Sequence, residues 1–152
     1  MDSRSKVSVP IWKVQLVRDG KAKTALRTIT NSADAAAIVI PKLAGADREH
    51  CLTVLLDTRN HVIGINTVSI GTVSASLVHP REVFKPAMLA NASSLILAHN
   101  HPSGELEPSQ QDVELTTRLL EAGRLVGIEL VDHLIICEQA HFSLRASGRI
   151  PW

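Results

Sequence analysis

The sequence predicts an α/β (α+β) protein with a mixed β-sheet flanked by helices. Short apolar runs bounded by turn residues alternate along the chain with longer segments whose apolar residues recur at helical spacing. Alternating helices and strands are typical of this class. The chain has 152 residues, of which 45% are hydrophobic and 20% charged. These values suit a globular core and exclude a disordered or fibrous protein.

The first 31 residues are expected to form an extension of one strand and a turn, ahead of a domain at 32–152. Polar and apolar side chains alternate within residues 8–18, which predicts an edge strand, and Asp19–Gly20 then provides a turn. A helix should follow, with Ser32 as its N-cap and Pro41 ending or kinking it.

The next elements are expected to be a hairpin and a helix. Residues 51–57 and 61–70 are predicted to be strands joined by a tight turn at 58–60, with extended chain at 72–77. Pro80 suits the first position of a helix that runs to about residue 91.

The second half repeats the alternation. Residues 94–98 form an apolar run that predicts a buried strand, and a loop rich in Pro and Gly follows it. A helix is expected over 109–126, closed by Gly127 as its C-cap. Two further strands are predicted at 128–137 and 141–144.

The residue pattern that carries chemistry lies where the 94–98 strand ends. His99 and His101 alternate on extended chain, so their side chains face the same side, and Asp112 lies in the first turn of the next helix. Two imidazoles and a carboxylate could converge on one cation and leave a fourth position open, as in catalytic zinc sites. The structural alternative is a capping box, in which Ser109 and Asp112 only stabilise the helix start.

The two cysteines do not form such a site. Cys51 and Cys137 lie in apolar runs and not in a C-x-x-C pattern, so they are interpreted as small core residues.

The loop and helix start resemble a known motif. The run from His99 to Asp112, HNHPSGELEPSQQD, resembles the JAMM motif of the JAB/MPN metallopeptidase superfamily, and most closely its RadC (UPF0758) family. The resemblance extends through 78–84 (VHPREVF) and 131–136 (VDHLII), and covers about 32–144. It implies a cytidine-deaminase-like JAB/MPN fold and a Zn²⁺ ion held by His99, His101 and Asp112.

The resemblance also implies a catalytic glutamate near the start of a strand. Glu49 matches that place best, and Glu82 is the alternative. A glutamate in the first turn of a helix, such as Glu82, is already explained by its stabilisation of the helix start. A carboxylate there could take a proton from water and return it to a leaving amine. Ser109 could donate a hydrogen bond to the oxyanion. His133 is interpreted as a strand histidine of the fold.

The expected activity is a zinc-dependent hydrolysis of a peptide or isopeptide bond in an unidentified protein or peptide substrate. The alternative is a non-catalytic or DNA-repair-associated module that keeps the fold and the metal site. Full-length relatives carry an N-terminal helix-hairpin-helix-like region, which the first 30 residues do not match, so any DNA contacts made by that region are expected to be absent. A nucleobase deaminase is excluded because its His-x-Glu and Pro-C-x-x-C patterns are missing.

Net charge and hydropathy bear on whether the chain binds nucleic acid or enters a membrane. The net charge is +1, which does not indicate nucleic-acid binding. No apolar run approaches the length of a bilayer span, and the first eight residues are polar and charged, unlike a signal peptide. A cytoplasmic protein is therefore expected.

Overall fold

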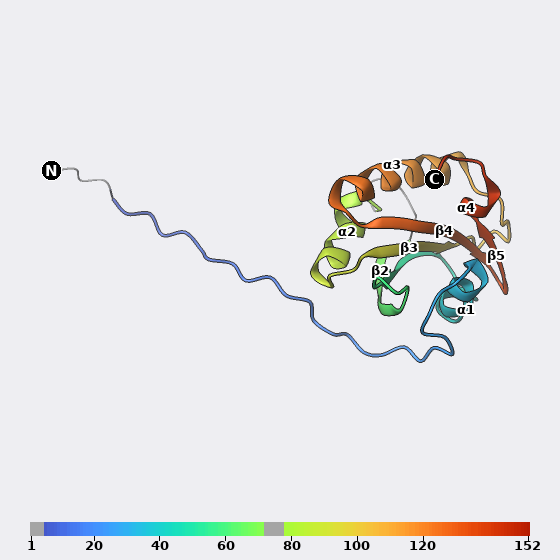
Figure 1. Cartoon of the computed structure of the whole chain (residues 1–152), viewed down its shortest axis with the longest axis horizontal. Helices are drawn as coiled ribbons and strands as arrows, with labels where there is room; N and C mark the ends of the chain where they lie inside the picture. Colours follow the sequence, from blue (N-terminus) through green and yellow to red (C-terminus); the bar gives the residue numbers. More distant parts are fainter. Residues whose placement is uncertain (1–4, 72–77) are drawn as a thin grey trace.

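The computed structural model describes residues 5–71 and 78–152. Its strands are β1 (Glu49–Leu56), β2 (Val62–Gly71), β3 (Ser94–Asn100), β4 (Glu129–Cys137) and β5 (Ala140–Ser143). Its helices are α1 (Ser32–Leu43), α2 (Pro80–Leu89), α3 (Gln110–Val126) and α4 (Leu144–Ser147). The strands form one sheet in the order β2-β1-β3-β4-β5, with helices on both faces (Figure 1).

The sheet is mixed. The pairs β1–β2, β1–β3 and β4–β5 are antiparallel, whereas β3 and β4 are parallel and are connected through α3. The predicted α/β class and mixed sheet are confirmed. Because β1 and β3 run in opposite directions, the start of β1 lies beside the end of β3.

The side chains of β3 point alternately into two hydrophobic cores, one on each face of the sheet. Leu95 and Leu97 pack with α2 and α3 on one face, whereas Ile96 and Ala98 pack with α1 on the other. All seven residues of β3 are buried. His99 follows the period of Leu95 and Leu97, so it belongs to the face that α3 covers.

Most predicted elements are confirmed, with small differences at their ends. The N-cap of α1 is Asn31 rather than Ser32, because the Asn31 side chain accepts a hydrogen bond from the Asp34 N–H. Pro41 lies inside α1, which ends two residues later. The α4 turn was not expected from the sequence. The chain expected to be extended at 72–77 lies outside the described residues.

The N-terminal strand expected at 8–18 is not formed within this chain. The structure has no helix or strand in residues 5–27, and the segment extends away from the domain (Figure 1). Alternation shows that a segment can form a strand, but a strand also needs a neighbour, and this segment has none. The chain first joins the sheet at Thr28, which forms an isolated bridge with His61.

Among the described residues, no helix combines the length and the apolar composition needed to cross a membrane.

Candidate metal centre

Three side chains from two consecutive elements converge at the end of β3. His99 lies in β3, His101 directly follows it, and Asp112 occupies the first turn of α3. These three residues form a group that could hold a metal ion, with one donor atom from each lying within 4.8 Å of the others. The loop between β3 and α3 therefore brings together the three ligands expected from the sequence.

Two of the three distances within the group are close to those between tetrahedral ligands. His99 Nε2 lies 2.9 Å from His101 Nε2. Each of these nitrogens lies 3.3 Å from an oxygen of Asp112. Ligands bonded at 2.0–2.1 Å in tetrahedral geometry are about 3.4 Å apart, so the two nitrogen–oxygen distances match this geometry, whereas the two nitrogens lie closer, at hydrogen-bond distance. Two imidazoles and a carboxylate are ligand types that zinc accepts.

A buried chain of hydrogen bonds determines the tautomer of His99. Thr116 Oγ1 donates to the main-chain carbonyl of Asp112 at 2.6 Å, so it accepts from Nδ1 of His133, also at 2.6 Å. Burial holds the pKa of His133 well below its usual value, so its Nε2 is unprotonated. His99 Nδ1 then donates to that nitrogen at 2.8 Å, and the lone pair of His99 Nε2 faces Asp112.

The tautomer of His101 is determined in the same way. Its Nδ1 lies 2.8 Å from the main-chain oxygen of Glu105, which can only accept. The lone pair of His101 Nε2 therefore also faces the cluster. Two lone pairs and a carboxylate repel one another unless a positive charge lies among them, which a metal ion or a proton can provide.

The electrostatics agree with a site for positive charge. When protons on the two Nε2 atoms take the place of an ion, burial still raises the pKa of the Asp112 carboxyl, but hydrogen bonds from His101 and His99 outweigh it and hold the pKa far below the usual range. The hydrogen bond with Asp112 raises the pKa of His101, and the charge of Glu49 adds to this. Asp112 is therefore ionised at neutral pH.

Asp112 also caps its own helix. Its Oδ2 accepts from the Ser109 N–H at 2.9 Å, and Ser109 Oγ accepts from the Asp112 N–H at 3.1 Å. The predicted capping box is thus present together with the ligand geometry. The cap fixes the carboxylate with Oδ1 turned towards His99.

Glu49 begins β1 on the same side of the sheet end. It lines an open depression of about 600 Å³ together with Asp47, Arg48, Gly71, Pro102 and Ser103. Asn100 joins the two strands here: its amide donates to the Arg48 carbonyl at 3.0 Å and accepts from the His50 N–H at 2.7 Å. These bonds hold the backbone on both sides of Glu49 against the end of β3.

The alternative glutamate has a different environment. Glu82 lies in the first turn of α2, where its carboxylate pairs with Lys85 at 3.1 Å and Arg81 at 3.5 Å. The Lys85 hydrogen bond lowers the pKa of Glu82. Glu82 lines neither the ligand group nor the depression beside it.

The sequence analysis did not identify His133 as the hydrogen-bond partner of His99. His133 is a buried strand residue, as expected, but it also contacts His99 directly. A polar ring in an apolar strand needs a buried partner, and that requirement was the only signal available. Which partner it meets depends on the parallel pairing of β3 and β4, with Leu97 opposite His133.

Comparison with known proteins gives one consistent result. Residues 29–149 match the family model described as "RadC-like JAB domain". A "UPF0758 protein" of Rubrobacter xylanophilus is 52% identical over 122 residues, which cover 80% of this chain and 53% of that protein. A "UPF0758 protein" of Moorella thermoacetica is 47% identical over 133 residues, covering 87% of this chain and 58% of that protein. The chain thus spans little more than half the length of these relatives.

Proposed function

This chain belongs to the RadC-like JAB domain family, and from that premise we propose that it is a zinc-dependent hydrolase of peptide or isopeptide bonds. The observation that carries the proposal is the convergence of two imidazole lone pairs and an ionised carboxylate at the end of β3. When bound there, a zinc ion acts as a Lewis acid and lowers the pKa of a water molecule to about 7.

In the proposal, His99, His101 and Asp112 hold the zinc ion. Their orientations are fixed by His133, the Glu105 carbonyl and the Ser109 N–H, respectively. Such outer partners maintain ligand geometry and basicity. The exposed depression at Glu49 leaves space for a substrate carbonyl beside the site.

Glu49 acts as the general base. Its carboxylate accepts a proton from water and then returns it to the leaving amine, so the amide bond breaks with no net change in the protein. Ser109 Oγ receives a hydrogen bond from the Asp112 N–H and keeps its own O–H proton. That proton can be donated to the oxyanion that develops on the carbonyl.

The first experiment measures metal content. Protein purified without chelators should carry about one zinc per chain, as expected for one site of three protein ligands. Asp112→Asn should lose zinc but keep most of its stability, because the amide oxygen can still accept from the Ser109 N–H. Less than about a tenth of an equivalent of transition metal after zinc is supplied would contradict the metal assignment.

The second experiment separates the glutamates. Glu49→Gln should keep the fold and the zinc but lose about 10²- to 10⁴-fold in rate against a peptide and isopeptide panel, because glutamine cannot accept a proton. Glu82→Gln is the matched control and should leave the rate unchanged, with only a small loss of stability from the helix terminus. If zinc-loaded protein turns over no member of the panel, the non-catalytic module becomes the better description.

A further inference from the structure

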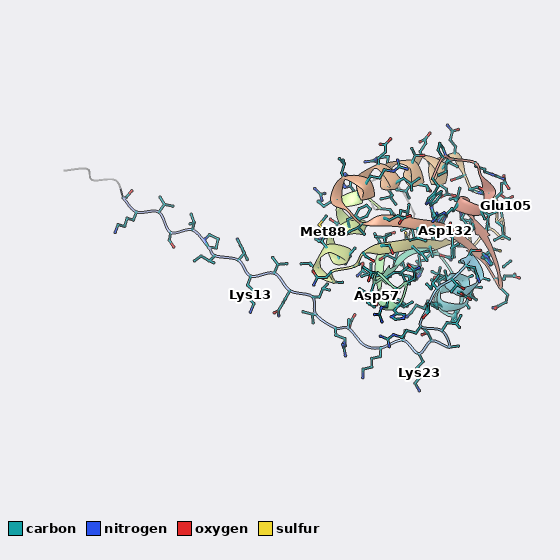
Figure 2. All side chains as sticks on the ribbon, in the orientation of Figure 1. Lys13, Lys23, Asp57, Met88, Glu105 and Asp132 are labelled. Atoms are coloured by element: carbon teal, nitrogen blue, oxygen red, sulfur yellow. The ribbon has the colours of Figure 1, made fainter. Side chains whose placement is uncertain are left out.

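The N-terminal segment, defined here as residues 7–17, exposes an unusual amount of apolar surface. Seven of the twelve large apolar side chains that are exposed in residues 5–71 and 78–152 lie in it. Ile11 and Trp12 are 98% and 82% exposed. Figure 2 shows the segment extending from the domain, with Lys13 projecting into solvent. Apolar residues concentrated in this way are typical of an interaction surface.

The segment has the pattern of a strand. Trp12, Val14 and Leu16 alternate with Lys13 and Gln15, so an extended backbone places apolar side chains on one face and polar ones on the other. Pro10 precedes this run and does not interrupt it. Only a partner strand is missing.

The sheet offers one unprotected edge. β2 is ten residues long, twice the usual strand length of about 5–6, and within the described chain it pairs along its length only with β1. It contains no charged residue and no proline, two of the devices that natural edge strands use against unwanted pairing; its pairing with β1 does carry two register shifts, which are a third such device. Ile63 and Ile70 are exposed on it. The other edge strand, β5, has only four residues.

The register of the chain excludes simple pairing of the segment with its own β2. Thr28 bridges His61 in antiparallel sense, and the Val62 N–H donates to the Arg27 carbonyl at 2.8 Å. If this ladder continued, Arg18 would lie opposite Gly71, the last residue of β2. Residues 7–17 would then run beyond the end of the strand.

A second copy of the chain can pair with the N-terminal segment. The nine residues between Arg18 and Thr28 give ten Cα–Cα steps, which can span about 33–36 Å when extended, close to the length of β2. We propose that residues 7–17 add as a strand to the free edge of β2 in a second copy, and that the exchange is reciprocal and forms a closed dimer. Main-chain hydrogen bonds provide the pairing, and Trp12, Val14 and Leu16 cover apolar surface of the partner sheet.

The test is the mass of the full chain in solution, measured by light scattering through about a hundredfold dilution. We expect twice the chain mass at high concentration and the single-chain mass on dilution. Val14→Lys and Thr67→Lys, one on each side of the pairing, should give the single-chain mass at every concentration. Gln15→Lys adds the same charge one residue away, on the opposite face, and should leave the dimer intact.

Trp12 fluorescence gives a second readout. In a Trp152→Phe background, in which Trp12 is the only indole, its emission should move to shorter wavelength as the dimer forms. The proposal is overturned if the wild-type chain stays single at all concentrations, if both lysine variants leave the dimer unchanged, or if masses exceed two copies. A blue-shifted Trp12 in the single-chain species would show that the segment folds back on its own domain, and would also overturn it.

Discussion

Thr116 is the residue on which the orientation of His99 depends. Its hydroxyl donates to the Asp112 carbonyl and accepts from His133, which in turn accepts from His99. All of these groups are buried, so each hydrogen bond lost leaves a polar atom without water. A neutral threonine that touches no candidate donor atom thus determines which nitrogen of His99 can bind an ion.

Replacing Thr116 with valine tests that dependence. The substitution keeps the shape but leaves His133 Nδ1 without an acceptor, and we expect a loss of about 1–3 kcal/mol in the free energy of unfolding. Zinc affinity should fall about 10- to 100-fold, as for other outer-partner substitutions. Thr117→Val is the control, because Thr117 donates to the Val113 carbonyl at an exposed position. Equal effects of both variants on zinc affinity would contradict the assignment.

The pairing of Asp112 with His101 predicts a pH dependence for metal-free protein. The folded pKa of Asp112 is lowered, so its stabilisation is present above the unfolded value of about 3.9 and is lost as pH falls through the folded value. The folded pKa of His101 is raised, so its stabilisation is present below about 6.5 and is lost as pH rises through the folded value.

Both contributions are therefore present between about pH 4 and 6.5. The difference in unfolding free energy between wild type and Asp112→Asn, measured in urea with a chelator present, should be largest in this window. It should decrease towards pH 9. A difference that grows with pH would mean that the ion pair does not stabilise the metal-free fold.

At the level of elements, α3 depends on a close approach to the chain that follows it. Gly123 is buried in α3, and a Cβ at this position would clash with the main-chain carbonyl of Ile128. The Ile128 N–H also donates to the Gly123 carbonyl at 3.0 Å. The turn into β4 therefore requires a residue without a side chain.

We expect Gly123→Ala to destabilise the domain, although helix propensity alone would stabilise it by about 1 kcal/mol. The clash is with backbone, which cannot move without displacing the start of β4. Thermal unfolding of the variant checks this, with Arg118→Ala at an exposed position of the same helix as the control. A higher midpoint for Gly123→Ala would show that the helix and the strand can separate.

The elements also show what sequence reasoning can and cannot reach. The strand at 94–98 and the helix at 109–126 were predicted because local apolar spacing and a capping box determine them. The His-His-Asp group followed, since its members lie close together in the chain. The contact between His99 and His133 could not be predicted, because it depends on strand pairing across 34 residues. The strand expected at 8–18 is absent from the chain's own sheet for the related reason that its pattern does not identify a partner.

For the whole molecule, a metal ion held at the candidate centre would couple binding to folding. Its ligands come from the β3 end and the α3 start, and both elements pack in the main core. An ion that binds only the folded chain adds stability according to its concentration, about 4 kcal/mol at a thousand times its dissociation constant. The unfolding midpoint should therefore rise with added zinc and fall with a chelator. A midpoint that zinc leaves unchanged would argue against a preformed site.

The antiparallel arrangement of β1 and β3 has one more consequence. Glu49 begins β1, and the turn at Thr58–Asn60 follows its other end, about 25 Å away along eight residues of strand. The two ends of β1 therefore have different tasks. One end lies beside the candidate ligands, whereas the other reverses the chain and receives residues 27–29 through the bridge of Thr28 with His61. Residues inserted at Arg59 are expected to change the stability of this turn, which Asp57 holds, without changing the chemistry at the other end.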